Sequence, residues 1–543
     1  MPHLLCRLQP GLLLMTASLM LFTSSTVAQP LPAPAAETSA DWYRSGAARA
    51  AANREQLLQA LLNAHRPAKN VILFVGDGMG PVTVTAARIY AGQKQGRSGE
   101  EHALTFEQLP HSALVKTYNV DQQVSDSAGT MTAIITGVKT NAGMISVGPE
   151  TTRGVCGSGP QLMTALEYAE LAGMATGVVS TARITHATPA ATYAKSPERD
   201  YESDADADTM SKPGDCKDIA TQLIELDQRE YPQHARQIDG IEVVLGGGRR
   251  NFLPAAAGGR RQDGRDLIKR WQQRNPDGHY VSSGSALAQL EAASDQGRLL
   301  GLFSDSHMAY ELDRASHDDI DEPSLAAMTA AAIRRLQTDA DGFFLHVEAG
   351  RIDHAHHATN PIRALEDVLA LDAAVAQAMQ LTDAEETLII VTADHSHVMS
   401  MAGYPTRGNP ILGKVVGNDM QGQPLEAPKL DADGYPYTTL GYINGIGFAQ
   451  LPGMRTADAI YGLADHDADA LPRGRVDLRD VDTTAEGFHP PTLVPLGGET
   501  HGGEDVAVYA SGPGASLLDG VIEQHVIYHV MNLAARLEQR AGR

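Results

Sequence analysis

The sequence predicts an α/β fold, in which a mostly parallel sheet carries helices on both faces. Short apolar runs rich in β-branched residues alternate along the chain with stretches of helical period. The runs are apolar throughout, as strands buried on both faces should be. The chain has 543 residues, 43% of them hydrophobic, which is enough for one large α/β domain with an insertion and a sizeable core.

Six apolar runs are expected to be strands, and four stretches in the body of the chain are expected to be helices. The expected strands are 71–76, 176–182, 241–247, 342–347, 387–393 and 506–512. The expected helices are 130–136, 161–172, 323–336 and 362–381. Because the two kinds of element alternate, we expect parallel strands joined by crossover helices.

The N-terminal segment is expected to lie outside the main fold. Residues 1–28 have the pattern of a signal peptide, with Arg7 near the start and an apolar run at 11–22 that is too short to span a bilayer. Residues 29–66 combine a Pro/Ala-rich spacer with a helix expected at 41–65. No later segment is apolar enough to span a membrane, so the sequence predicts a periplasmic or secreted protein.

Charge and cysteine usage narrow the classes of function. The formal net charge of −23 argues against a nucleic-acid-binding surface, which is usually basic. Cys156 and Cys216 remain after the signal peptide, and two cysteines in an exported protein most simply form one disulfide. The alternative is a pair of buried thiols. Neither cysteine lies in a C-x-x-C pattern, so a cysteine zinc site is not expected.

Residues 402–488 interrupt the alternation of strands and helices. They are rich in Gly, Pro, Asp and Tyr and have no long helical pattern. We therefore expect a loop-rich insertion that divides one catalytic domain into a first part at 67–401 and a C-terminal part at 489–543.

Metal-binding side chains follow several of the expected strands. A parallel α/β sheet gathers its ligands at the carboxyl ends of its strands. The residues expected to meet there are Asp77, Ser127, Glu348, Asp353, His357, Asp394, His395 and His501. These carboxylates and imidazoles suit two zinc ions and one magnesium, and the serine adds a nucleophilic hydroxyl. The sequence thus predicts a metal-dependent hydrolase.

Two of these residues have an alternative interpretation. Asp77 is flanked by glycines, which let a metal come close but also occur in dinucleotide-binding loops. The spacing lacks the full dinucleotide fingerprint, and the carboxylate would repel a pyrophosphate. Ser127 precedes a helical run, whose N-terminus can stabilise an anion, yet most such serines are ordinary N-caps. Its surroundings are not G-x-S-x-G.

Histidines accompany the remaining carboxylates. Asp353 and His357 are four residues apart, so they share a face if the segment is helical. Asp394 and His395 can reach one metal only if the strand ends there, because adjacent strand residues point to opposite faces. His397 is either a further ligand or, as we favour, a supporting or surface histidine.

Eight long motifs lie along the chain and carry a resemblance to a known family. They are G-D-G-M-G at 76–80, D-S-A at 126–128, T-G-V-K-T at 136–140, H-A-T-P-A at 186–190, R-D-Y-E-S-D-A-D at 199–206, F-L-H-V-E-A-G-R-I-D-H-A-H-H at 344–357, T-A-D-H-S-H at 392–397 and T-H-G-G-E-D at 500–505. From near Lys69 to near Leu533 the chain resembles the secreted alkaline phosphatases. G-Y-P-T-R-G at 403–408 and L-G-G-G-R at 245–249 make it more similar to animal-type and related bacterial members than to the short enterobacterial type.

This resemblance implies roles for individual residues. Ser127 is expected to be the nucleophile that is transiently phosphorylated, and Arg199 the arginine that grips the phosphate. The implied ligand sets are Asp353, His357 and His501 for one zinc, Asp77, Asp394 and His395 for the second zinc, and Asp77, Thr188 and Glu348 for magnesium. The residues expected to support these groups are Asp126, His186 and His354.

The resemblance also implies an architecture. The fold is expected to be a three-layer α/β/α sandwich with a crown-like insertion at 402–488. A homodimer is expected, with the helix at 41–65 as an arm around the partner. Cys156 and Cys216 match a disulfide of the animal-type members.

The sequence differs from the animal-type members in two features, so two of their properties are not expected here. These relatives have an extra calcium site near the segment matching 301–311, but Ser304 replaces an acid there, so no calcium is predicted. The chain ends in a polar stretch at 538–543, which does not predict a lipid anchor.

We therefore expect a metal-dependent phosphate monoester hydrolase that acts through a phosphoserine and releases inorganic phosphate. Small phosphate monoesters with varied leaving groups are the expected substrates, with two Zn²⁺ and one Mg²⁺ per subunit and an alkaline pH optimum. A phosphodiesterase, sulfatase or phosphate-transferring mutase is the nearest alternative, and Arg199 favours a monoesterase. A non-catalytic exported metal or phosphate binder is the more distant one.

Overall fold

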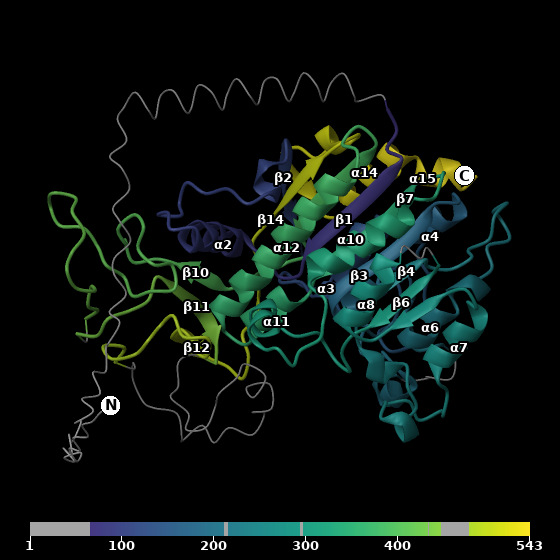
Figure 1. Cartoon of the computed structure of the whole chain (residues 1–543), viewed down its shortest axis with the longest axis horizontal. Coiled ribbons are helices and arrows are strands. Elements are labelled where there is room, and N and C mark those ends of the chain that lie inside the picture. The colour runs from purple at the N-terminus through teal and green to yellow at the C-terminus, as the bar shows by residue number, and fades with distance from the viewer. Residues whose placement is uncertain (1–65, 211–215, 294–296, 433, 447–476, 543) are drawn as a thin grey trace, which may run out of the picture.

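A large central sheet organises the protein (Figure 1). The computed structural model describes residues 66–210, 216–293, 297–432, 434–446 and 477–542, and the main sheet has ten strands in this part of the chain. In spatial order the strands are β15 (Val521–Glu523), β2 (His111–Lys116), β14 (Val506–Ser511), β8 (Thr387–Ala393), β1 (Asn70–Gly76), β7 (Phe343–Ala349), β3 (Ala175–Arg183), β4 (Val243–Gly247), β6 (Leu299–Leu302) and β5 (His279–Val281). Neighbours pair in parallel except for β14, which is antiparallel to both β2 and β8.

Helices cover both faces of this sheet. On one face α10 packs against β3 and α12 against β1 and β7, whereas α4 and α14 pack on the other face (Figure 1). The helices are α2 (Pro81–Lys94), α3 (Ser127–Thr136), α4 (Ala165–Leu171), α5 (Ala187–Ala190), α6 (Ile219–Ile224), α7 (Leu267–Arg274), α8 (Gly284–Ala292), α9 (Glu311–Ser316), α10 (Leu325–Leu336), α11 (Arg351–His357), α12 (Pro361–Leu381), α14 (Val526–Ala535) and α15 (Leu537–Arg540). The predicted α/β sandwich with a mostly parallel sheet is therefore confirmed.

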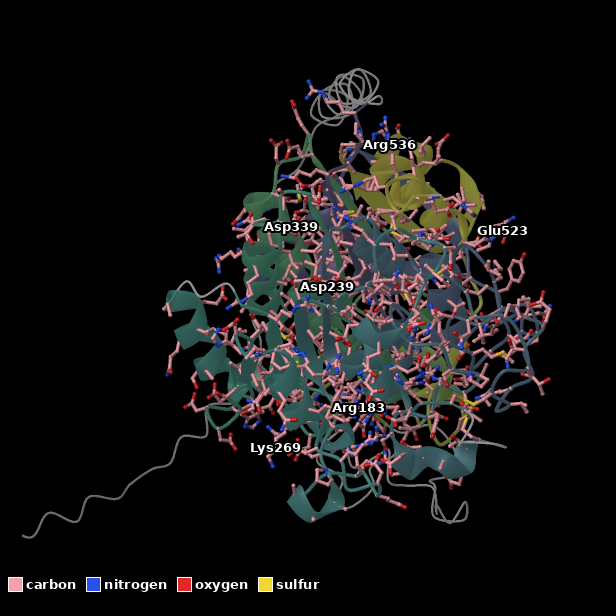
Figure 2. All side chains as sticks on the ribbon, turned by 90° about the vertical axis from the view of Figure 1, so that its right-hand side faces the viewer. Arg183, Asp239, Lys269, Asp339, Glu523 and Arg536 are labelled. Carbon is pink, nitrogen blue, oxygen red and sulfur yellow. A yellow bond between two sulfur atoms is a disulfide. The ribbon has the colours of Figure 1, made fainter. Side chains whose placement is uncertain are left out.

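The central strands are buried on both faces, as their uniform apolarity predicts. Every residue from Val71 to Val75 of β1 has no exposed surface. Strands β3 and β7 are parallel, and Asp339, shortly before β7, lies well away from Arg183, at the end of β3 (Figure 2). The carboxyl ends of β8, β1, β7 and β3 therefore meet at one edge.

The sequence placed the central elements well and the peripheral ones poorly. All six predicted strands are present, but β2, β5, β6 and β15 were missed because they are short or partly polar. The helix expected at 161–172 begins only at Ala165, since the Thr164 hydroxyl and the Glu167 carboxylate form a capping box there. The signal peptide expected at 1–28 and the helix expected at 41–65 lie outside the described residues.

Two small sheets stand beside the main one. In the first, β10 (Met399–Met401) pairs antiparallel with β11 (Leu440–Gly445), which pairs in parallel with β12 (Thr492–Pro495). In the second, β9 (Ser396–His397) pairs with β13 (His501–Gly502). None of the described residues between 402 and 488 lies in a helix. The boundaries of the insertion stay a prediction.

A disulfide joins Cys156 to Cys216, as predicted, with their Cα atoms 5.9 Å apart. It links the loop before α4 to the segment before α6, sixty residues further along the chain. Among the described helices, none combines the length and the apolar character that crossing a bilayer requires.

Candidate active site

The site lies where the central parallel strands end. Asp77 follows β1 and Asp394 follows β8, and the two strands are neighbours in the sheet. The backbone N–H of Gly78, which has the left-handed φ of 70°, donates to Asp394 Oδ1 at 3.0 Å. A glycine is required here because a side chain would collide with the His397 ring. The two carboxylates are thus held side by side.

His501 reaches the same edge by a different route. It is the first residue of the two-residue strand β13, a few positions before β14. Because β14 runs antiparallel to β8, it begins where β8 ends, so the residues that precede it lie near Asp394 and His395. The His501 ring stacks on the His395 ring with centroids 3.6 Å apart.

Ser127 is the first residue of α3, and its hydroxyl lies within the site. Asp126 is the N-cap, because its carboxylate accepts the N–H groups of Ala128 and Gly129. The interpretation of the serine as an ordinary N-cap is therefore wrong. Ser127 Oγ is 3.1 Å from His395 Nε2, and the residue is 1% exposed.

Three of the predicted ligands form a first group. Asp353 Oδ1 is 3.3 Å from His357 Nε2 and 3.4 Å from His501 Nε2, and the two imidazole nitrogens are 3.1 Å apart. Four ligands around zinc at about 2.0 Å lie about 3.3 Å from one another. The spacing of these three atoms therefore fits three corners of a tetrahedral zinc site.

A second group has the same spacing. His395 Nε2 is 3.3 Å from Asp77 Oδ1 and 3.4 Å from Asp394 Oδ2. These distances again match the edges of a tetrahedron with zinc bond lengths. Ser127 Oγ stands at a comparable distance, 3.1 Å, from His395 Nε2.

A third group is richer in oxygen. Thr188 Oγ1 lies 3.4 Å from Asp77 Oδ2, and an oxygen of Glu348 lies within 4.8 Å of Asp77 and of a His186 nitrogen. We had expected Glu348 to follow its strand, but it is the penultimate residue of β7. One of its oxygens accepts from the Ser180 hydroxyl, while Oε1 is buried and accepts no hydrogen bond. Such an oxygen set fits magnesium.

The carboxylates of these groups are crowded enough to shift their pKa values. Burial, and then the charge of Asp77, raises the pKa of Glu348 well above its usual range and that of Asp394 to about 7. Burial alone would lower the pKa of His395, but the carboxylates of Asp394 and Asp77 raise it to about 10. Excess negative charge of this kind is relieved by bound cations.

Backbone carbonyls orient two of the ligand histidines. His357 Nδ1 donates to the Glu499 carbonyl at 2.6 Å, and His501 Nδ1 donates to the Ser125 carbonyl at 2.7 Å. With the proton held on Nδ1, each ring turns the lone pair of Nε2 towards the first group. This is the tautomer that metal binding needs.

Arg199 stands beside the serine, held by Asp126. Its Nη1 donates to Asp126 Oδ2 at 3.0 Å, and its Nη2 lies 3.2 Å from His186 Nε2. Burial would raise the pKa of Asp126, but Arg199 and the N–H of Gly129 hold it below the usual value. The guanidinium is therefore held by the residue that immediately precedes Ser127.

His186 and His354 lie behind the third group, and sequence reasoning missed a third ring there. The His354 ring is 5.5 Å from that of His186 and 4.0 Å from that of His307, between centroids. The Nδ1 atoms of His186 and His354 are buried without a hydrogen-bond partner. His307 comes from the loop between β6 and α9, and no motif marked it.

His397, whose role the sequence left open, and Glu499, to which the sequence gave no role, also belong to the site. His397 is buried and its Nε2 is 2.7 Å from Asp353 Oδ1, so it is not a surface histidine. The supporting role that we favour over that of a further ligand stays a prediction. Glu499 binds His397 in turn. The only available signal for Glu499 was its position two residues before His501.

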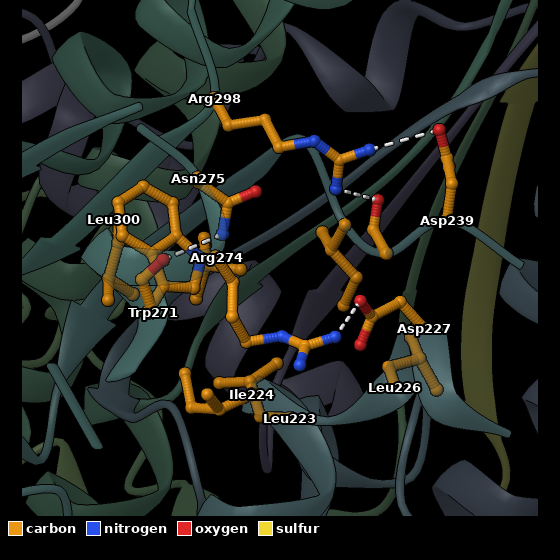
Figure 3. Close-up of a pocket in the computed structure, with 13 residues that line it drawn as sticks. Leu223, Ile224, Leu226, Asp227, Asp239, Trp271, Arg274, Asn275, Arg298 and Leu300 are labelled. Carbon is orange, nitrogen blue, oxygen red and sulfur yellow. Dashed lines mark hydrogen bonds and ion pairs between the residues drawn. The ribbon is translucent and has the colours of Figure 1, made fainter. Parts of the chain in front are cut away.

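A pocket at the opposite edge of the sheet is distinct from these groups (Figure 3). Arg298 and Asp239 lie just before β6 and β4, so the pocket faces the amino ends of these strands, with Trp271 in its wall. Arg298 Nη2 is 3.1 Å from Asp239 Oδ2, and Arg274 pairs with Asp227. Each guanidinium is thus neutralised by at least one carboxylate, and none of the predicted site residues lines this pocket.

Comparison with known proteins identifies the family. The alkaline phosphatase family model matches residues 68–537. The tissue-nonspecific alkaline phosphatase isozyme of Gallus gallus is 42% identical over 521 residues, which cover 92% of this chain and 90% of that protein. The chain belongs to the alkaline phosphatase family. The corresponding isozyme of Homo sapiens is 40% identical over 492 residues, covering 88% of this chain and 85% of that protein.

Solved structures agree with this membership. The alkaline phosphatase of Thermus thermophilus matches with a TM-score of 0.60 and 26% identity, over 88% of this chain and 94% of that one. The alkaline phosphatase from the Antarctic bacterium TAB5 matches with a TM-score of 0.55 and 21% identity, over 87% and 98%, which shows the shared fold. The predicted class of enzyme, an alkaline phosphatase that hydrolyses phosphoric monoesters, is confirmed.

Proposed function

We propose that this alkaline phosphatase uses Ser127 as a nucleophile and passes through a phosphoserine. The observation that carries the proposal is the 3.1 Å separation between Ser127 Oγ and His395 Nε2, inside a group whose other members are Asp77 and Asp394. A serine hydroxyl is a weak nucleophile unless a neighbouring group activates it. A cation held by Asp77, Asp394 and His395 would be that neighbour.

The donor sets support two zinc ions and one magnesium per subunit. Asp353, His357 and His501 would hold the first zinc, and Asp77, Asp394 and His395 the second. Asp77, Thr188 and Glu348 would hold magnesium. When bound, these cations supply positive charge that neutralises a phosphate dianion and lowers the pKa of the serine hydroxyl.

Side chains of the protein bind the phosphoryl group and carry out the bond exchange. Arg199 binds two phosphoryl oxygens through its planar guanidinium, and Asp126 holds that guanidinium in position. Ser127 Oγ, having lost its proton, bonds to phosphorus while the bond from phosphorus to the alcohol oxygen breaks, and the alcohol leaves with a proton. Water then attacks the phosphoserine, which releases inorganic phosphate and returns the hydroxyl to Ser127.

Substrate range and pH dependence follow from this arrangement. The groups named above address the phosphoryl group and not the alcohol, so we infer tolerance of many leaving groups. Histidine and carboxylate ligands bind metal only when deprotonated, so we expect activity to rise into alkaline pH. The substrates are small phosphate monoesters.

Two measurements test the proposal against the alternatives. Brief reaction with a ³²P-labelled monoester followed by acid quench should leave label on Ser127, which a non-catalytic phosphate binder would not retain. Rates on matched phosphate monoesters, phosphate diesters and sulfate esters should favour the monoester, because Arg199 and the cations together match a dianion. A faster diester rate would assign the chain to a different activity.

The remaining predictions concern the whole protein. We propose that residues 1–28 are a signal peptide and that the protein works in the periplasm or after secretion. We also propose a homodimer, with 29–66 as spacer and arm and 402–488 as a crown-like insertion between the two parts of the catalytic domain. N-terminal sequencing of the exported protein and light scattering test these two proposals.

A further inference from the structure

Glu499 is a buried carboxylate whose two oxygens bind different partners. The residue is 3% exposed and lies two positions before His501. Oε1 accepts the backbone N–H of Val398 at 2.7 Å, and Oε2 is 2.6 Å from His397 Nδ1. Since both oxygens are engaged, the side chain has one orientation, and this orientation fixes the His397 ring.

His397 in turn fixes the orientation of a proposed zinc ligand, Asp353. Its Nε2 lies 2.7 Å from Asp353 Oδ1. A carboxylate bound to a cation only accepts hydrogen bonds, so this Nε2 carries the proton. Glu499, His397 and Asp353 therefore form a chain of hydrogen bonds that ends on the carboxylate of the first group. Groups behind a metal ligand set its orientation in this way.

The backbone of Glu499 holds a second ligand of the same group. The Glu499 carbonyl accepts from His357 Nδ1 at 2.6 Å, and the Glu499 N–H donates to the His357 carbonyl at 3.0 Å. The residue thus contacts Asp353 through His397 and contacts His357 directly. The third ligand, His501, follows Glu499 by two residues. All three ligands of the first group depend on where Glu499 lies.

Strand β11 determines where Glu499 lies. Asn444 of β11 makes two hydrogen bonds to Thr500: its Nδ2 donates to Oγ1 at 2.9 Å, and its Oδ1 accepts the Thr500 N–H at 3.0 Å. The next residue, Gly445, has a φ of 128°, and a Cβ there would come within 3.0 Å of Glu499 Cβ and 2.4 Å of Thr359 Cγ2. The end of β11 is therefore packed closely against the segment that carries Glu499 and His501.

We propose that Glu499 is a positioning residue that holds Asp353 and His357 ready to bind zinc, and that β11 sets its position. The inference rests on the proposed function, because it takes the first group as a zinc site. It gives the small sheet of β10, β11 and β12 a part in metal affinity, although none of the proposed ligands lies on it.

The test measures zinc affinity without using the reaction. Metal-stripped protein competes with a chromogenic zinc chelator, and folding is followed by circular dichroism. We expect Glu499→Ala to weaken zinc binding about 10- to 100-fold, the usual effect of losing a group behind a ligand. With its proton on Nε2, neutral His397 presents Nδ1 as an acceptor, so the residue at 499 must donate to it. Glu499→Gln supplies that donor and an acceptor for the Val398 N–H, so it should bind zinc within about threefold of the unmodified protein. At saturating zinc, Glu499→Ala should recover most of its kcat.

Matched variants separate positioning from general stability. Glu170 is also a buried glutamate, and it accepts the N–H groups of Asp239 and Gly240 far from the zinc ligands. Glu170→Ala should lower the midpoint of urea unfolding and leave zinc affinity unchanged. Asn444→Ala removes only the contacts to Thr500 and should weaken zinc binding less than Glu499→Ala does.

The possible results distinguish a failure of the role proposed for Glu499 from a failure of the proposed function. Unchanged zinc affinity in folded Glu499→Ala, or a Glu499→Gln variant as weak as the alanine variant, would overturn the positioning role. A loss of affinity in Glu170→Ala equal to that in Glu499→Ala would overturn it as well. If the unmodified protein binds zinc but does not hydrolyse monoesters, the proposed function fails and the role of Glu499 stands.

Discussion

The hydroxyl of Ser127 lies 3.1 Å from Nε2 of His395, although the two residues are 268 positions apart in the chain. The serine begins α3 and the histidine follows β8, so the contact exists only because the helix starts at the carboxyl edge of the sheet. Both residues are buried, and the distance is similar to the 3.1–3.4 Å between the predicted ligand atoms of the first two groups. The proposed nucleophile thus lies as close to His395 as a further ligand would.

Replacing Ser127 by alanine should abolish turnover. We expect kcat to fall about 10³-fold or more, because no other hydroxyl takes its position beside His395, while zinc content and the unfolding midpoint stay near those of the unmodified protein. Steady-state kinetics with metal analysis measures this. Ser125→Ala is the matched control, since Ser125 Oγ is buried and makes no hydrogen bond. Normal turnover and a trapped phosphoenzyme in Ser127→Ala would contradict the assignment.

Replacing Arg199 by lysine should weaken recognition of the phosphoryl group. Lysine cannot form the two parallel hydrogen bonds of a guanidinium, so we expect kcat/KM to fall about 10- to 100-fold, as for one lost charge-assisted bond. Inhibition by inorganic phosphate should weaken in parallel. Arg153→Lys is the control, because Arg153 is half exposed and pairs with Glu198. Equal losses in the two variants would argue against a specific role of Arg199.

Removing the metals should stop catalysis reversibly. Without cations, the carboxylates of Asp77, Asp394 and Glu348 repel one another in a buried site, as the raised pKa values of the last two residues indicate. Dialysis against a chelator should abolish monoester hydrolysis, and zinc with magnesium should restore it together. Full activity after stripping, with no metal detectable by mass spectrometry, would disprove metal dependence.

Gly78 should tolerate no side chain. An added Cβ would lie 2.3 Å from His397 Cδ2 and 3.3 Å from the Asp353 Cα, so Gly78→Ala displaces the residues that support the first group. We expect zinc affinity and activity to fall at least about tenfold. Gly96 also has a left-handed φ but nothing within 4 Å of an added Cβ, so Gly96→Ala should cost only about 1–2 kcal/mol of stability. Chelator competition and urea unfolding compare the two variants.

Stability should depend on pH through Glu242, far from the metals. Burial raises its pKa to about 7, despite its contact with Arg298. The folded state then binds this proton more tightly than the unfolded state does. The stability it contributes is fully present below about pH 4.5 and is lost as pH rises through 7. Urea unfolding from pH 5 to pH 8 should show a smaller decline for Glu242→Gln than for the unmodified protein. Parallel declines would contradict the assignment.

The sequence by itself determined the class of fold and the chemical inventory. Short, uniformly apolar runs rich in β-branched residues, such as 71–76 and 387–393, indicate strands buried on both faces, and parallel strands bring the residues after them to one edge. Asp77, Asp394 and His395 could therefore be expected together before any contact was known. The alternation of strands and helices likewise indicated the layers.

The tertiary structure decided which residues from distant segments contact one another in the site. Nothing local shows that β14 runs antiparallel and so delivers His501 to the same edge, or that Asp126 caps α3 and leaves Ser127 as its first residue. Glu499 drew no attention because its partners, His397 and the end of β11, are distant in sequence and meet it only after folding. Periodicity records which face of an element is buried, whereas hydrogen bonds between distant segments depend on the packing of the whole chain.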